Sequence, residues 1–312
     1  MRTIDKEKIV GKSGHVVVLK GGASVEREIS LLSGDAVFQG LKRLGVRASV
    51  LDASDELITQ LKELSPDLVF IMLHGQGGED GIVQGLLESM KLKYTGSRVL
   101  ASALAMDKVK AKLIWQQLGL STADFTLLNS DTNWEKVIAE FGEVIVKPVN
   151  GGSSLGMLIV SDAESLQRQY EVASTFDSAV MVEKCIVGNE YSVGVIDDHV
   201  LPTVQLRTKR DFFDFDAKYI DEDTETICPP ELTDVKQREL NTLVKAAFNS
   251  LGCRGLARVD VMQDSNEKFY LLEVNTVPGM TSHSFVPLAA EKSGIDFDQL
   301  LLRILHAELA LG

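Results

Sequence analysis

The first hundred residues repeat one pattern twice: a short apolar run, a glycine-rich loop, and a stripe of apolar residues at helical spacing. Residues 15–19 (HVVVL) form the first run, which ends at Gly21 and Gly22 before a helical stripe over 29–44. Residues 68–73 form the second run, followed by the acidic glycine-rich loop 74–81 (HGQGGEDG) and a helical stripe. Strands alternating with helices favour a parallel sheet covered by helices. We therefore expect an α/β domain with a parallel sheet at the N-terminal end.

The alternation breaks near residues 94–97 (YTGS), where we place the first domain boundary. A helix is expected over 108–119. Residues 144–160 (VIVKPVNGGSSLGMLIV) then place two apolar runs around a polar loop, which is typical of an antiparallel hairpin. The middle of the chain should therefore be an α+β unit.

The remainder of the chain also mixes strands and helices. Its expected elements are strands at 180–182 and 191–196, a hairpin over 256–275, and helices over 234–251 and 297–309. Residues 207–225 are charged and aromatic without either period, which indicates a long ordered loop or lid. The predicted architecture is thus α/β and α+β in three domains, residues 1–96, 97–182 and 183–312.

Composition excludes several classes of partner. The chain has 312 residues, with 32 Lys and Arg against 45 Asp and Glu, a formal charge of -13. Such a field repels nucleic acid and anionic membrane surfaces. We find no apolar run of signal-peptide or membrane-span length, and the three cysteines are widely spaced without a CxxC pair. We therefore expect a cytoplasmic protein with reduced cysteines and no nucleic-acid or membrane partner.

The hairpin GLARVDVMQDSNEKFYLLEVN carries the strongest chemical signal. If its turn centres on residues 266–267, strand alternation places Asp260 opposite Glu273 and Arg258 opposite Asn275, all on one face. Two facing carboxylates repel, so a cation is expected between them. Two carboxylates and one amide suit Mg²⁺ completed by phosphate oxygens and water. A solvated hairpin face neutralised by Arg258 is the equally open alternative.

A second signal is the loop after the expected strand that ends at Lys147. Its glycines and hydroxyls (residues 150–156, NGGSSLG) can place backbone N–H groups around phosphates, while Lys147 supplies a positive charge. Residues 152–156 also match the G-x-S-x-G pattern of a hydrolase nucleophile elbow. That elbow requires a helix after the turn, whereas an apolar β-like run follows here, so the hydrolase interpretation is disfavoured.

Other polar residues stand at the ends of expected strands or in the expected lid. Glu26 either receives a substrate ammonium or favours a helix N-terminus, and His74 is either functional or a buried histidine bonded to the backbone. Lys218 and Tyr219 either reach substrate from the lid or belong to a charged surface loop. Residues 275–284 offer hydroxyls and a glycine N–H suited to an oxyanion and a carboxylate.

These blocks, taken together, resemble those of the D-alanine-D-alanine ligases. The matching segments are KGGASVEREISL, LHGQGGEDG, YTGSRVLASALAMDK, VKPVNGGSSLGM, EYSVGV, AKY, GLARVDVM and LLEVNTVPGMTSHS, in order along nearly the whole chain. The resemblance implies a three-domain ATP-grasp fold with an N-terminal parallel-sheet domain. It also implies ATP-dependent ligation of two D-alanines through an acyl phosphate, for peptidoglycan synthesis, by a homodimer.

The resemblance implies roles for single residues as well. ATP would lie between the second and third domains, and two Mg²⁺ ions, replaceable by Mn²⁺, would be bound there. The residues implied are Lys108 and Lys147 at the phosphates, Glu183 and Glu190 at adenine and ribose, Cys185, Ile186 and Phe212 around the nucleotide, and Asp260, Glu273 and Asn275 at the metals. Those implied for substrate and catalysis are Glu26, Ser153, Tyr219, Lys218, Arg258, Gly279, His74, Ser284 and Phe285.

Three residues depart from the pattern of the resembling proteins. Cys185 replaces a frequent aromatic residue, Val277 a frequent serine and Phe285 a frequent leucine, which bears on nucleotide stacking and on the second substrate pocket. The resemblance also implies that the second nucleophile is an amine, because similar proteins that make D-alanyl-D-lactate typically lack the tyrosine that stands here at Tyr219. A ligase with a different second substrate, or a nucleotide-binding regulator without catalysis, are the alternatives.

Overall fold

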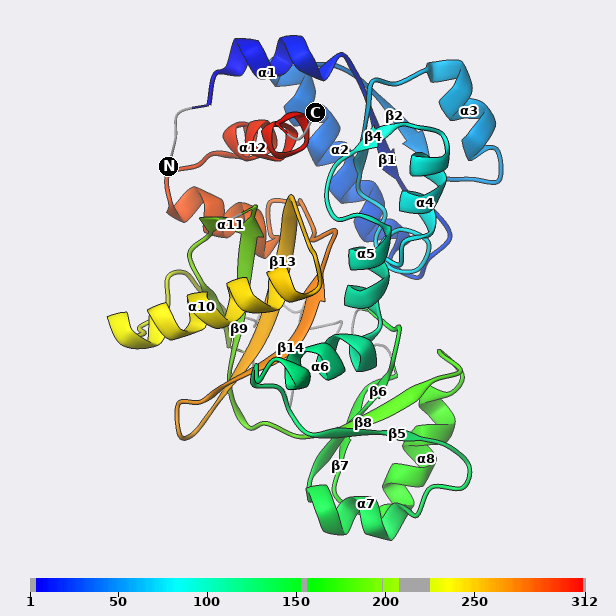
Figure 1. Cartoon of the computed structure of the whole chain (residues 1–312), viewed down its shortest axis with the longest axis vertical. Coiled ribbons are helices and arrows are strands. Elements are labelled where there is room, and N and C mark those ends of the chain that lie inside the picture. Colours follow the sequence, from blue (N-terminus) through cyan, green and yellow to red (C-terminus); the bar gives the residue numbers. More distant parts are fainter. Residues whose placement is uncertain (1–3, 153–155, 198, 208–224, 311–312) are drawn as a thin grey trace.

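The computed structural model describes residues 4–152, 156–197, 199–207 and 225–310. Within these ranges three sheets follow one another along the chain, with helices packed against each (Figure 1). The first sheet is parallel, and the other two are antiparallel. The expected combination of α/β and α+β architecture is therefore confirmed.

The first sheet has strand order β2-β1-β3-β4, and every neighbouring pair is parallel. The strands that the sequence predicts, β1 and β3, are central and almost wholly buried, whereas β2 is a partly exposed edge strand. The elements are β1 (His15–Lys20), β2 (Arg47–Asp52), β3 (Leu68–Ile71), β4 (Lys93–Tyr94), α2 (Arg27–Leu44), α3 (Leu57–Leu64) and α4 (Ile82–Ser89).

The second sheet has strand order β5-β8-β6-β7 and is antiparallel throughout. The predicted hairpin over 144–160 forms, with Val144 paired to Val160. Helix α8 packs on β6 and on α7, and their shared core includes Leu166, Val146 and Val182. The elements are β5 (Phe125–Leu128), α7 (Trp134–Phe141), β6 (Val144–Pro148), β7 (Leu158–Val160), α8 (Ala163–Ala173) and β8 (Val180–Lys184).

The third sheet has the path β12-β11-β9-β13-β14, with β10 paired to β9. Three helices bury their apolar residues against it: α10 and also α5 and α6, which precede the second sheet in the chain. The elements are α5 (Val99–Met106), α6 (Lys108–Gln117), β9 (Gly188–Ile196), β10 (His199–Val200), β11 (Val204–Arg207), β12 (Glu225–Ile227), α10 (Asp234–Ser250), β13 (Leu256–Asp264) and β14 (Phe269–Asn275).

The last two helices, α11 (Phe285–Lys292) and α12 (Phe297–Leu309), return to the start of the chain. Helix α12 lies beside α2 and α1 (Lys6–Ser13), and its leucines share one apolar core with the first sheet (Figure 1). At Gly40 an added Cβ would collide with the Leu301 side chain, so the close approach of α2 and α12 requires glycine there.

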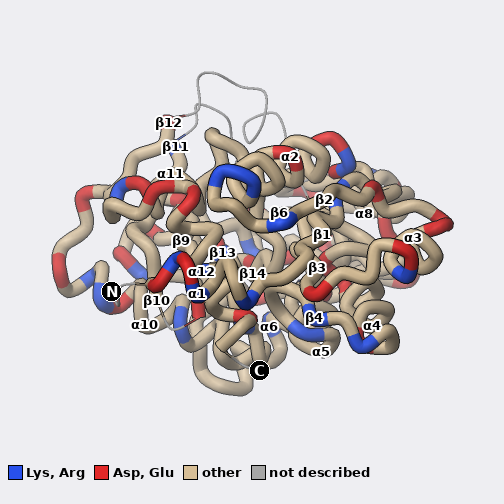
Figure 2. The backbone as a smooth tube through the Cα atoms, turned by 90° about the horizontal axis from the view of Figure 1, so that it is seen from above, with Lys and Arg blue, Asp and Glu red and all other residues tan. Residues whose placement is uncertain are grey.

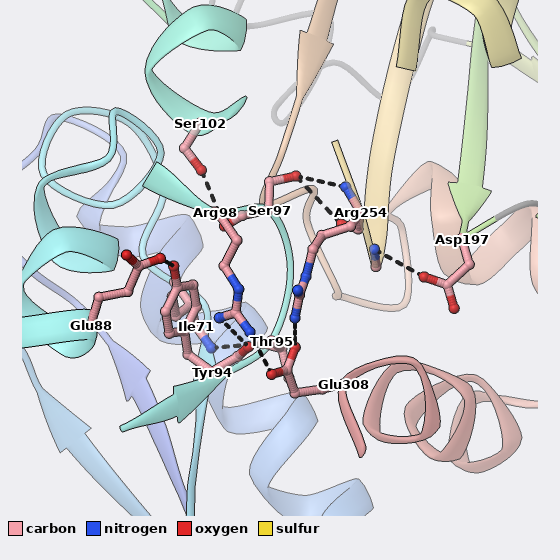
Figure 3. A network of polar contacts seen from close by, with 11 residues as sticks. Ile71, Glu88, Tyr94, Thr95, Ser97, Arg98, Ser102, Asp197, Arg254 and Glu308 are labelled. Carbon is pink, nitrogen blue, oxygen red and sulfur yellow. Dashed lines mark hydrogen bonds and ion pairs between the residues drawn. The ribbon is translucent and has the colours of Figure 1, made fainter. Parts of the chain in front are cut away.

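A buried carboxylate fixes this return. Glu308 of α12 accepts from Arg98 at 2.7 Å through one oxygen and from Arg254 through the other (Figure 3). Arg98 follows β4, and Arg254 precedes β13, so one carboxylate joins α12 to the segment after the first sheet and to the segment before β13 of the third. The guanidinium of Arg98 also lies 4.2 Å from the centre of the Tyr94 ring.

Charged residues differ between the surface and the interior. Basic and acidic residues both lie on outer helices such as α3, which carries Lys62 and Glu63 (Figure 2). Three lysines are instead at most 8% exposed: Lys108, Lys112 and Lys147. Among the helices of the described ranges, we find none that is both long and apolar enough to cross a membrane.

Candidate active site

A cavity of about 540 Å³ lies where α2, β14 and the loop after β6 meet. It brings together residues from the first sheet's helix, the third sheet and the segment that follows it. The predicted residues that line it are Glu26, Lys108, Gly152, Arg258, Glu273, Asn275, Gly279, Ser284 and Phe285. Because these positions are distant in sequence, the fold gathers most of the expected catalytic and metal groups into one space.

The floor of the cavity is the hairpin of β13 and β14. Asp260 pairs with Glu273 and Arg258 with Asn275, which confirms the predicted register at this end. From Val261 onward the register is shifted by one residue, because a bulge interrupts the ladder, so the predicted pairing is wrong nearer the turn. The bulge lies beyond the four polar residues and leaves them on one face.

Two cationic side chains neutralise the two facing carboxylates. Arg258 donates to Asp260 through Nε at 2.9 Å and Nη2 at 2.7 Å, while Lys108 Nζ lies 3.3 Å from a Glu273 oxygen. Ser192 Oγ donates to Asp260 at 2.6 Å from the neighbouring strand. The expected cation is thus supplied here by the protein, as charge balance requires.

The same donor set fits a hard divalent cation. Glu273 and Asn275 line the cavity, and Asp260 lies directly beneath Arg258 at 5% exposure. Carboxylate and amide oxygens are ligands that Mg²⁺ accepts when phosphate oxygens and water complete its octahedron. Asn275 Oδ1 accepts from the Val277 N–H at 3.0 Å, which orients the amide oxygen.

Glu26 begins α2 at the N-cap position, yet its side chain makes no capping hydrogen bond there. Its carboxylate is buried and lies against two glycines: a Cβ added at Gly75 or at Gly152 would come within 2.6 Å of Glu26 Oε2. Gly75 has a φ of +70°, which favours glycine, and a Cβ at Gly152 would require the Glu26 carboxylate to move. Glu26 thus lines the cavity and also stands at the N-terminus of α2, where its charge is favourable to the helix, so the structure agrees with both interpretations of Glu26.

His74 is buried behind the cavity and is absent from its lining. Burial lowers the pKa of His74 to about 4, helped by the nearby charge of Arg258. Its Nε2 lies 3.3 Å from Ser33 Oγ, which in turn accepts from the Met280 N–H at 3.1 Å. His74 is therefore placed to support the segment after β14.

That segment carries the expected oxyanion and carboxylate groups. Ser284 precedes α11, and its Oγ accepts from the Thr281 N–H at 3.0 Å. A Cβ at Gly279 would lie 2.7 Å from Ser284 Oγ, so the two residues are in close contact. The guanidinium of Arg258 lies 5.8 Å from the centre of the Phe285 ring, which places aromatic bulk beside the expected catalytic arginine.

The residues expected at the nucleotide lie along β6, β8 and the connection to β9. Lys147 and Lys112 both contact Glu183: Lys147 pairs with Oε1, and Lys112 Nζ lies 2.7 Å from Oε2. The two ammonium groups outweigh burial and hold the pKa of Glu183 at about 2. Glu183 is therefore an ionised carboxylate, and each of its two oxygens contacts a lysine.

The connection between β8 and β9 holds three further expected residues. Cys185 and Ile186 are half-buried, and Glu190 is half-buried on β9. Burial raises the pKa of the Cys185 thiol to about 11, so it stays protonated near neutral pH. Cys185 thus offers small apolar bulk and no thiolate.

Four expected residues lie outside the described ranges: Ser153, Phe212, Lys218 and Tyr219. The predicted lid over 207–225 falls almost wholly in this gap, which begins after β11 and ends at β12. The hydrolase alternative can still be judged, because β7 follows the 152–156 loop and pairs with β6. A nucleophile elbow needs a helix there.

Comparison with known proteins agrees with this geometry. Models of the C-terminal and N-terminal parts of D-ala D-ala ligase match residues 114–306 and 47–97. A D-alanine--D-alanine ligase of Saccharophagus degradans is 48% identical over 95% of both chains, and one of Nitrosococcus oceani is 48% identical over 95% of this chain and 94% of its own. The chain belongs to the D-alanine-D-alanine ligase family.

Solved structures of the D-alanine-D-alanine ligase family share the fold. One from Bacillus anthracis matches with a TM-score of 0.86 and 34% identity, over 96% of this chain and 98% of that one. A second structure of the Bacillus anthracis enzyme, complexed with ATP, matches with a TM-score of 0.85 and 31% identity over the same shares.

Two buried residues of the site were not predicted from the sequence. Glu79 lines the cavity and accepts from the N–H groups of Gly75 at 2.7 Å and Val277 at 3.2 Å, so it ties two loops together. The sequence indication for Glu79 is an acidic residue within the glycine-rich loop 74–81. The indication for Lys112 is clearer, because Lys112 lies one helical turn after Lys108 on the face that buries Trp115.

Proposed function

We propose that the protein is an ATP-dependent ligase that joins two D-alanines into D-alanyl-D-alanine, a component of peptidoglycan. The observation that carries the proposal is the single cavity in which Glu26, Lys108, Arg258, Glu273 and Gly279 meet. An acid for an ammonium, cations for phosphate and donors for an oxyanion are the groups that such a reaction requires. Family membership and the ligase activity for which the relatives are named support the same reaction.

In the proposed reaction the carboxylate of the first D-alanine attacks the γ-phosphorus of ATP, giving an acyl phosphate and ADP. The amine of the second D-alanine then attacks the acyl carbon, loses a proton and expels phosphate. The products are the dipeptide, ADP and phosphate. A tetrahedral oxyanion forms in the second step, and stabilising it lowers the barrier.

Substrate roles are proposed from the cavity for Glu26, Arg258, Gly279, Ser284 and Phe285, and from the family resemblance for the other residues. Glu26 would hold the first ammonium, with Ser153 and Tyr219 completing its hydrogen bonds and Lys218 assisting phosphate transfer. Arg258 and the Gly279 N–H would stabilise the oxyanion. The roles proposed for the second D-alanine are that Ser284 binds its carboxylate, that Phe285 narrows its pocket, and that His74 supports both from behind.

Nucleotide roles are proposed for residues around β6, β8 and β14. Lys108 and Lys147 would contact the phosphates, and Glu183, Cys185, Ile186, Glu190 and Phe212 would surround adenine and ribose. Two Mg²⁺ or Mn²⁺ ions bound by Asp260, Glu273 and Asn275 would neutralise phosphate charge. Support comes from the donor set on one hairpin face and from the relative whose structure holds ATP.

Assembly and domain organisation are further parts of the proposal. We propose a homodimer and three domains divided near residues 96 and 182. The oligomer is measured by light scattering at several concentrations. The domain limits are measured by limited proteolysis, with cleavage expected first near these positions.

The direct test is a reaction of purified protein with D-alanine, ATP and Mg²⁺. We expect equal amounts of ADP, phosphate and D-alanyl-D-alanine, and no product when Mg²⁺ or D-alanine is omitted. L-alanine is the matched control. Absence of ADP formation with D-alanine contradicts the proposal, and ADP without dipeptide indicates another acceptor.

A second candidate is a ligase of the same kind with a different second substrate, because Phe285 and Val277 stand beside the proposed pocket. A screen of D-serine, D-lactate and larger D-amino acids as acceptors separates the two. D-alanine is expected to give the highest kcat/KM.

A further inference from the structure

We propose that Lys112, a buried residue without an assigned role, is a positioning residue for the nucleotide: it neutralises Glu183 so that the charge of Lys147 remains available to the phosphates. The inference rests on the proposed nucleotide site. It assigns to Lys112 an electrostatic task that is exerted through Glu183, with no contact between Lys112 and the substrate.

The contacts among the three residues carry the first step. Glu183 uses Oε1 for Lys147 and Oε2 for Lys112, so each carboxylate oxygen has its own ammonium. The Lys112 side chain is 1% exposed, Glu183 2% and Lys147 8%. Water therefore screens these charges little, and their interactions are stronger than those of a surface pair.

Counting charges gives the second step. Two ammonium groups and one carboxylate leave the cluster with a net positive charge, whereas Lys147 and Glu183 alone would be neutral. A neutral pair attracts a phosphate much less than a net cation does. Glu273 and Glu190 add further negative charge near Lys147, so the positive charge of Lys112 is needed to keep the surroundings of Lys147 suitable for an anionic ligand.

The third step is the fixed position of Lys112. Its Nζ donates to Thr122 Oγ1 at 2.6 Å, and Thr122 Oγ1 donates to the Leu271 carbonyl of β14 at 2.8 Å. The Leu271 N–H also donates to Ser121 at 2.8 Å. Lys112 therefore lies where the second and third sheets, which would enclose the nucleotide, adjoin.

A purely structural role is the competing explanation, since the Thr122 link also joins the sheets. The two roles differ in the ligands that they affect. If Lys112 acts through charge, its loss should weaken the binding of a nucleotide that carries phosphates and leave the binding of adenosine, which carries none, nearly unchanged. If Lys112 only holds the sheets together, both ligands should bind more weakly.

The experiment measures binding of Mg²⁺ with the non-hydrolysable analogue β,γ-imido-ATP by titration calorimetry, in the absence of D-alanine. We expect Lys112→Met to weaken binding roughly tenfold or more. Binding of adenosine to Lys112→Met should stay within about threefold of the wild type, because adenosine carries no phosphate. Lys110→Met on the exposed side of the same helix is the matched control.

Thr122→Val separates the structural role, because it removes the hydroxyl and keeps all three charges. We expect it to lower the melting temperature while leaving nucleotide affinity unchanged. In steady-state assays Lys112→Met should raise KM for ATP and leave KM for D-alanine near its wild-type value. Unchanged affinity of Lys112→Met for the analogue, or an equal loss of affinity for adenosine, overturns the inference.

Two outcomes keep the test decisive. If Lys112→Met does not fold, Lys112→Gln, which also lacks the charge but can hydrogen-bond to Thr122, carries the same comparison, and an affinity for the analogue within about threefold of the wild type contradicts the inference. Failure of the proposed function is distinguishable, because a wild type that binds the analogue but forms no dipeptide refutes the ligase activity and leaves the role of Lys112 in place.

Discussion

Asp260 and Glu273 face each other across the β13–β14 ladder, and the register slips by one residue immediately beyond them. The turn is tighter than strand alternation alone suggests. The bulge compensates for this difference, so the two carboxylates still lie opposite each other. Arg258 and Lys108 neutralise them in this structure. The pair is therefore neutralised by protein cations here, and in the proposed complex Mg²⁺ would take over part of that role.

The first prediction is that Glu273→Gln weakens the apparent affinity of the enzyme for Mg²⁺. An amide donates as well as accepts and carries no charge, so it is a poorer ligand for a hard cation. We expect the Mg²⁺ concentration for half-maximal turnover to rise roughly tenfold or more. Glu267→Gln at the exposed hairpin turn is the control, and an unchanged titration for Glu273→Gln removes that residue from the metal site.

The second prediction concerns Arg258→Ala. Loss of an oxyanion donor should reduce kcat by about 10²-fold or more, while affinity for the nucleotide analogue stays near wild type. Asp260 would lose its bidentate partner and keep the hydrogen bond from Ser192, so we expect unfolding to become easier by about 3 kcal/mol.

Arg168→Ala is the control for Arg258→Ala, because Arg168 makes an exposed pair with Glu164 at 3.7 Å. Assays run well below the lower melting temperature separate the two effects. A kcat near wild type contradicts the catalytic role even where stability falls.

The hairpin shows how far sequence reasoning reaches. Alternation gave the shared face of Arg258, Asp260 and Glu273, because it is a local property of strands. The bulge was missed because it depends on the turn: the Asp264 carboxylate accepts from Asn266 and Lys268 at 2.9 Å and tightens it. Because the hydrogen bonds of Asp264 tighten the turn, one extra residue is left on β14, and this residue forms the bulge.

Other features needed the tertiary fold. The buried strands β1 and β3 were predicted from apolar runs, whereas the edge strand β2 was not, because its partly exposed residues lack a clear period. Lys112 and Glu183 come together only when α6 packs beside β8. The roles of Glu79 and His74 likewise depend on contacts with the distant 277–280 segment.

The third prediction is a change in pH dependence in Glu79→Gln. Burial, with the nearby Glu26, raises the pKa of Glu79 from 4.5 to about 8, although two backbone N–H groups and Arg258 act in the opposite direction. The folded state thus binds this proton more tightly than the unfolded state. Its stabilising contribution is complete below about pH 4.5 and is lost as the pH rises toward about 8.

Glutamine does not titrate, so Glu79→Gln should remove this loss, which is on the order of a few kcal/mol. Between about pH 5 and about pH 8, the melting temperature of the wild type should fall relative to that of Glu79→Gln. The difference between the two proteins should become constant only at the upper end of this range. Glu88→Gln, outside the cavity, is the comparison. Parallel pH curves for wild type and Glu79→Gln show that Glu79 has an ordinary pKa.

The fourth prediction is that Gly152→Ala impairs the first substrate. The added Cβ would come within 2.6 Å of Glu26 Oε2, so the Glu26 carboxylate must move away from the loop. A displacement of even about 1 Å at a substrate-orienting group has large kinetic effects, so we expect kcat/KM for D-alanine to fall about 10²-fold while affinity for the nucleotide analogue changes little.

Gly11→Ala, whose new Cβ meets nothing within 4 Å, is the matched control for Gly152→Ala. Dipeptide synthesis is followed at several D-alanine concentrations to separate the two binding steps. Equal loss at both steps, or a loss of nucleotide affinity, would show that the glycine serves the whole loop and that Glu26 is not its target.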